Sequence, residues 1–227
     1  MKNSVDPALL RFQLKTLLTD KVALLQLAFF HWWLGNFVFG RKGMAVAAAA
    51  DAALWTNYGL LVALCVALLM GSVCVGFTLI KPRAYGMVEL LLASPLSLRK
   101  LAGTSFAACL LFSLGNLAAH FIFLKLRYGA VPFGAGFFLS LTASAALTAL
   151  LLLGAVVASL RRKDADQLHV VLIFLGVLIF AVLTFTRLTL PIPGWLPPAL
   201  AAALPPAFLL LWAKFDRFLD KERAVRL

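Results

Sequence analysis

The chain has 227 residues, of which 63% are hydrophobic and 13% are charged, and its formal net charge is +12. A soluble domain of this length is close to half apolar and a quarter charged, because much of its surface faces water. The composition therefore excludes an ordinary water-soluble enzyme and predicts an all-α domain that spans a membrane several times.

The first predicted element precedes the membrane spans. Asp6 and Pro7 have the residue types of a helix N-cap and of the first helical position. Leucines then recur at helical spacing, at Leu10, Leu14, Leu17 and Leu18. We expect an amphipathic helix that lies on the cytoplasmic leaflet. A frayed, charged terminus is the alternative, because a short isolated helix is only marginally stable.

Six apolar segments are long enough to cross a bilayer, which takes roughly 20 helical residues. They are residues 22–40, 58–80, 101–124, 132–160, 168–186 and 195–213. We expect the outer part of the last segment to be broken or re-entrant, because it contains Pro197, Pro198, Pro205 and Pro206. The predicted organisation is an interfacial helix over residues 1–21, a six-helix transmembrane domain over 22–213 and a basic cytoplasmic tail over 214–227.

Lysine and arginine are distributed unevenly between the two sides of these spans. Sixteen of the 21 lie at the N-terminus, in the second and fourth connections and in the tail, and five lie opposite: Arg41, Lys42, Lys125, Arg127 and Arg187. Short basic loops stay in the cytoplasm, so both termini are expected there and the chain is expected to be a multi-pass protein of a bacterial inner (plasma) membrane. Membrane lipids, and no nucleic acid, are the partners that this charge predicts.

Two pairs of polar residues lie inside predicted spans, where such residues are costly and often functional. His31 and Asn36 belong to the first span, and Asn116 and His120 belong to the third. In one interpretation these four residues line a substrate path between two copies of the chain. In the other, which we favour, they form hydrogen bonds between helices or lie near the outer interface, where water reaches, since such bonds commonly join membrane helices.

The second connection, which leads into the third span, is the most informative segment. Pro82 is expected to end the second span, and Ser94 with Pro95 interrupts the chain again. A short helix fits between them and exposes Glu89, while Ser94 is expected to cap the next helix with Pro95 at its first position. The result is a helix–break–helix elbow on the cytoplasmic surface, shaped to receive force from a soluble partner.

This connection resembles a known signature. The run ELLLASPLS at residues 89–97, with Gly86 before it and Gly103 after it, is similar to the cytoplasmic motif between the second and third spans of ABC-2 type transporter permeases. In that family the motif forms a coupling helix that docks on a separate ATP-binding subunit. The resemblance thus implies a coupling element at 81–100 and a partner-coupling role for Gly86, Glu89, Leu90, Leu91, Ser94 and Pro95. The alternative is an unrelated loop with a capping Ser-Pro pair.

The resemblance implies the permease subunit of an ATP-driven exporter that is not itself an enzyme. Two permease copies, identical or homologous, would assemble with two ATPase subunits, which would hold the ATP and the magnesium. This chain is expected to hold no cofactor, no metal and no catalytic residue. Its apolar spans favour a lipid-like, amphipathic or hydrophobic cargo.

Three other functions can be set against this one. A haem-binding or haem-handling membrane protein, with His31 and His120 as axial ligands, is the main alternative. An intramembrane serine protease would need Ser105 to meet a histidine. His120 lies about four turns further along the same helix and cannot reach it, and His169, near the cytoplasmic side, is a formal candidate. A phospholipid-processing enzyme would need carboxylates at metal-ligand spacing, and Asp51, Asp164 and Asp166 do not supply it.

Overall fold

The computed structural model describes residues 5–21, 24–25, 28–29, 31–32, 60, 64–65, 68–86, 97–128, 135–161, 165–186 and 193–214. This part of the chain is helical and contains no strand, so the all-α prediction is confirmed for it. The elements in chain order are α1 (Pro7–Thr19), the π-helical turn η1 (Gly76–Ile80), α5 (Lys81–Ala84), α7 (Leu98–Tyr128), α8 (Ala135–Arg161), α9 (Ala165–Thr186) and α10 (Leu196–Ala213).

Three of the described helices are long and apolar enough to cross a membrane. These candidate spans are Leu98–Arg127, Phe137–Leu160 and Leu196–Ala213, and a shorter apolar helix covers Leu68–Ile80. They suit a membrane protein, and they lie where the sequence predicts the third, fourth, sixth and second spans. The total of six spans and the orientation of the termini stay predictions.

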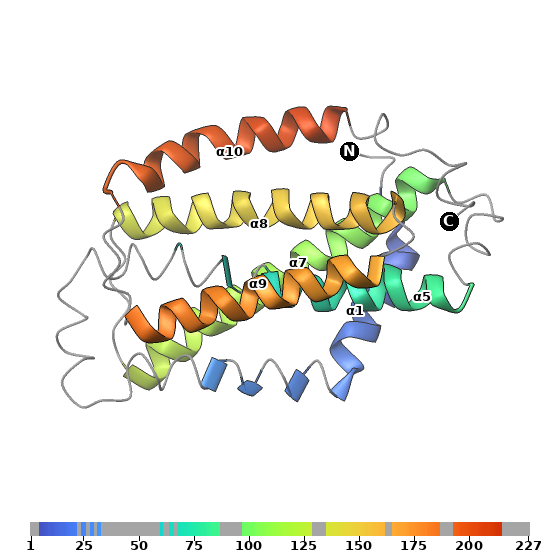
Figure 1. The fold of residues 1–227 in the computed structure, drawn as a ribbon, viewed down its shortest axis with the longest axis horizontal. Coiled ribbons are helices and arrows are strands. Elements are labelled where there is room, and N and C mark those ends of the chain that lie inside the picture. The colour runs from blue at the N-terminus through green and yellow to red at the C-terminus, as the bar shows by residue number, and fades with distance from the viewer. Residues whose placement is uncertain are drawn as a thin grey trace.

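The helix α8 lies at the centre of the bundle. It packs along α10 on one side and against α7 on the other, and α9 contacts it less extensively (Figure 1). Leu152 and Val156 of α8 are buried in the core that these contacts form. Aromatic rings join α7 to α10, where the Phe106 ring centroid lies 5.4 Å from that of Trp212. The core is thus a layer of apolar side chains between long, roughly side-by-side helices.

The expected break in the proline-rich segment is wrong for residues 196–213, because α10 is one continuous helix. Pro197 and Pro198 stand in its first turn, where the missing N–H groups leave no helical hydrogen bond unmade. Pro205 and Pro206 lie inside the helix. Prolines are tolerated at such positions in membrane helices, since packed neighbours and small local adjustments satisfy the freed carbonyl groups. Residues 187–192 lie outside the described part.

Pro82 does not end the second span either. Helical structure runs from η1 through Pro82 to Ala84. Because α5 continues η1 without a break, Pro82 stands inside a helical stretch, directly after the π-helical turn. The chain leaves the helix at Gly86, whose φ of 67° lies in the left-handed region that favours glycine.

The cap of the next described helix is also shifted from its expected position. α7 begins at Leu98, and the Oγ atom of Ser97 accepts a hydrogen bond from the Lys100 N–H at 3.2 Å. The serine that caps α7 is therefore Ser97 and not Ser94, which lies outside the described residues. Both serines have the right chemistry, and the register of the helix decides between them.

Candidate functional site

The helix α1 is capped as the sequence predicts. The Asp6 carboxylate accepts hydrogen bonds from the N–H groups of Ala8 and Leu9, both at 3.0 Å through Oδ1. Pro7 occupies the first turn, where its missing N–H costs nothing. These features begin the helix at a fixed residue and so fix which of its side chains face the bundle.

Two hydrogen bonds tie α1 to the beginning of α7. The backbone N–H of Asp6 donates to Thr104 Oγ1 at 2.8 Å, and Gln13 Nε2 donates to Ser105 Oγ at 2.9 Å. Leu17 adds a fully buried apolar contact. Thus α1 packs on the bundle with one face. Its apolar residues Phe12 (60% exposed) and Leu18 (58%) are not covered by the bundle and can contact another surface.

This joint between α1 and α7 was not predicted from the sequence. Ser105 was considered only as the nucleophile of a protease, and no partner was predicted for Thr104 or Gln13. A signal was present, however: a polar pair within the first turns of an apolar span needs partners, and a neighbouring helix is the natural source of them.

Among the six residues of the expected coupling site, only Gly86 is described. It follows α5 and marks the start of the connection that ends at Ser97. The predicted coupling residues Glu89, Leu90, Leu91, Ser94 and Pro95 lie outside the described residues. Both ends of this connection lie at the end of the bundle where α1 packs, since α1 contacts both α7 and η1 (Figure 1).

The structure brings together three of the four residues of the expected substrate path. Nδ1 of His31 lies 3.1 Å from Nδ1 of His120, and the two rings stack with centroids 5.1 Å apart. Asn116 lies one helical turn before His120 on α7, and its Nδ2 donates to the Phe112 carbonyl at 2.7 Å. The fourth residue, Asn36, lies outside the described part of the chain.

This geometry favours the structural interpretation of the histidines. Two ring nitrogens at 3.1 Å form a hydrogen bond only if one of them carries a proton and the other does not. The pair therefore links His31 to α7 by one hydrogen bond between the two rings. His120 has no exposed surface, so a substrate could reach it only if the helices moved apart.

A second polar contact joins the second span to α7. Cys74 and Cys109 are both buried, and Thr78 Oγ1 lies 3.7 Å from Cys109 Sγ. Within the described residues, no group of three or more histidine, cysteine or acidic side chains is arranged to hold a metal ion. The thiols thus act as small packing residues at a helix–helix contact.

Comparisons with protein-family models, with curated proteins and with solved structures gave no match to this chain.

Proposed function

We propose that this chain is the permease subunit of an ABC-2 type transporter that exports a lipid-like, amphipathic or hydrophobic substrate. A separate nucleotide-binding subunit hydrolyses the ATP, and two permease copies assemble with two such subunits in a bacterial inner membrane. The observation that carries the proposal is the position of the run at residues 89–97, which fills a connection between two apolar helices.

The surroundings of this connection support a coupling role. The glycine of the motif, Gly86, has the positive φ that a tight exit from a helix requires. The connection leads directly into α7, whose first turns hold α1 through Thr104 and Ser105. A push on the connection is therefore transmitted to a long span and to the surface helix together, as in rigid-body switching of packed helices.

The main alternative, haem handling by the histidine pair, has less support from the geometry. Metal–imidazole bonds are about 2.0–2.1 Å long, so two nitrogens on opposite sides of one metal ion lie about 4 Å apart. The Nδ1 atoms of His31 and His120 are 3.1 Å apart, and the rings are stacked with an interplanar angle of 26°. Haem ligation by this pair would require the rings to separate first.

Co-purification tests the proposal. The chain is extracted from its native membrane in mild detergent, and the ATP-binding subunit that accompanies it is quantified by mass spectrometry. Glu89→Lys should reduce the recovered ATPase subunit by about tenfold or more, because a reversed charge at an interface costs several kcal/mol. Glu222→Lys, the same change in the tail, should leave the recovery unchanged.

Membrane insertion of both variants is checked by fractionation, since a loss of insertion would mimic a loss of binding. A chain that comes out alone, even after crosslinking through a cysteine placed at Glu89, would refute the coupling role. Unchanged recovery with Glu89→Lys would refute the assignment of this residue.

A further inference from the structure

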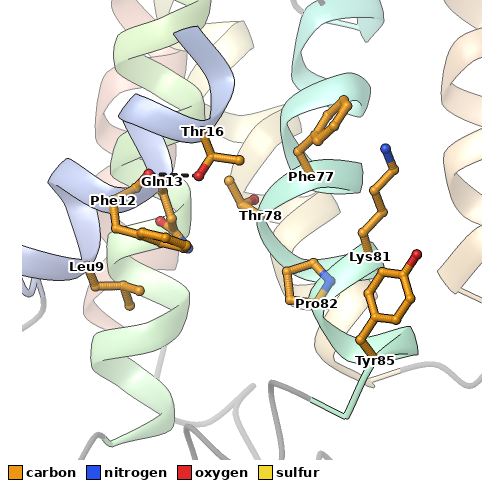
Figure 2. Close-up of a pocket in the computed structure, with 9 residues that line it drawn as sticks. All are labelled: Leu9, Phe12, Gln13, Thr16, Phe77, Thr78, Lys81, Pro82 and Tyr85. Carbon is orange, nitrogen blue, oxygen red and sulfur yellow. Dashed lines mark hydrogen bonds between the residues drawn. The ribbon is translucent and has the colours of Figure 1, made fainter. Parts of the chain in front are cut away.

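A cavity of about 220 Å³ lies between α1 and the end of the second span (Figure 2). Leu9 and Phe12 of α1 form one wall, and Phe77 of η1 and Pro82 of α5 form the other. The wall is mainly apolar, and the polar groups that line it are few. A cavity of this kind suits a ligand with an apolar body and a small number of polar atoms.

One polar atom of the cavity is an unused acceptor. Gln13 lines the cavity and is 5% exposed, and its Nε2 is engaged by Ser105. Its Oε1 is buried without a hydrogen-bond partner among the described residues. The lining hydroxyls do not serve it, because Thr16 donates to the Phe12 carbonyl and Thr78 donates to the Cys74 carbonyl. Buried acceptors are normally paired, so Oε1 calls for a donor that the described residues do not supply.

The charge at the cavity is positive. Lys81 contributes to the lining, and its ammonium group lies 3.7 Å from the centroid of the Phe77 ring. The described residues that line the cavity include no carboxylate. An anionic group is therefore favoured at its mouth. The mouth lies where an apolar helix ends beside α1, so the position fits the headgroup level of a bilayer.

We propose that the cavity binds one anionic glycerophospholipid with a hydroxyl-bearing headgroup, of the phosphatidylglycerol class. The phosphodiester pairs with Lys81, a headgroup hydroxyl donates to Gln13 Oε1, and an acyl chain packs against Phe12 and Phe77. A zwitterionic lipid lacks the net charge, and a diacylglycerol lacks the phosphate. The bound lipid is a fixed component between α1 and the second span and is separate from any cargo, so the inference does not depend on an ATPase partner.

Native mass spectrometry of the full chain in mild detergent tests this proposal. Phosphatidylglycerol, phosphatidylcholine and diacylglycerol with identical acyl chains are added at equal concentration, and the retained adducts are counted. The chain should retain phosphatidylglycerol about fivefold more than either competitor, as expected for one lysine beside an anionic headgroup. Lys81→Gln should abolish this preference. Lys100→Gln, the same change in the first turn of α7 and outside the cavity lining, should preserve it.

A matched pair of threonine variants tests the cavity itself. Thr16→Phe fills the cavity and should remove the lipid adduct, because Thr16 is part of the lining. Thr19→Phe is the control, since Thr19 is an exposed residue one turn later on α1 with the same type of backbone hydrogen bond. Equal retention of the three lipids, equal losses for the two lysine variants or a retained adduct with Thr16→Phe would each overturn the proposal.

Discussion

The N-terminal segment is joined to α7 at two levels, and the two joints differ in chemistry. The first uses neutral donors and hydroxyl acceptors, Asp6 N–H to Thr104 and Gln13 to Ser105. The second is the stacked pair of His31 and His120, about 24 Å further along α7 at 1.5 Å per residue. The first joint lies beside the proposed coupling connection, and the second lies within the apolar bundle.

The difference shows how environment changes the role of a polar contact. Thr104 and Ser105 have no exposed surface and Gln13 is 5% exposed, so the first joint meets water or headgroups only when α1 moves away from α7 at this end of the span. Inside the bundle no replacement is available, and an opened contact leaves polar atoms in an apolar medium. We therefore expect the first joint to be adjustable and the second to act as a fixed point about which α7 is held.

The largest expected effect concerns the placement of the two joints relative to the membrane. In a background without native cysteines, Lys100→Cys should react with an impermeant thiol reagent only from the cytoplasm, and Lys125→Cys only from outside. The measurement is labelling of intact cells compared with inverted vesicles. The reverse pattern would place the α1 joint on the outer side and would remove the basis for coupling.

Among the two joints, removal of the second, the His31–His120 pair, should cost the most stability. His120→Ala deletes a fully buried ring together with its hydrogen bond, and we expect the free energy of unfolding to fall by about 2–4 kcal/mol. Unfolding in mixed micelles, followed by tryptophan fluorescence, measures this change. Ile122→Ala is the control, because Ile122 is 59% exposed on the same helix and should cost less than about 1 kcal/mol.

Removal of the first joint, in which α1 meets the beginning of α7, should cost less stability. Ser105→Ala removes the acceptor of Gln13 Nε2, and we expect a loss of about 1–2 kcal/mol in the free energy of unfolding. Ser113 is a matched serine on α7 whose buried Oγ has no hydrogen-bond partner within the described part of the chain. Ser113→Ala should therefore be nearly neutral, and equal losses for the two variants would show that the Gln13 contact adds nothing.

The smallest effect is expected at the helix cap. Asp6→Ala removes the Oδ1 acceptor but keeps the backbone N–H that reaches Thr104. A lost N-cap costs about 1 kcal/mol, so unfolding measured in the same micelles should show a modest shift. A much larger loss would mean that the cap and the α7 contact act as one unit, and a double variant with Thr104→Val would then be non-additive.

The positions of the long helices could be predicted because an apolar run of bilayer length is compatible with few structures other than a membrane-spanning helix. α8 and α9 begin and end within a few residues of the predicted segments. Their exact ends were harder to predict, since these depend on which of several competent residues caps the helix. Ser97 was preferred over Ser94 for α7, and both Pro82 and the prolines of α10 were accommodated within helices.

The residues of the site could be predicted from the sequence where their polarity differs from that of the neighbouring residues. Histidine inside an apolar span is conspicuous, and the approach of His31 and His120 was considered from the sequence alone. Gln13, Thr104 and Ser105 are common residue types near helix ends, and only the packing of α1 on α7 reveals that they meet. A pairing between segments about 90 residues apart has no local signature in one sequence.

The π-helical turn at Gly76–Ile80 has an angular consequence for everything that follows it. Such a turn holds one residue more than an α-helical repeat, and one residue corresponds to about 100° around a helix axis. The faces of α5 are therefore out of phase with those of the apolar helix before it. If the π-helical turn lost that residue, α5 would rotate about the helix axis. Gly86 would then leave the bundle in a different direction, so a small change in winding would change the direction of the connection.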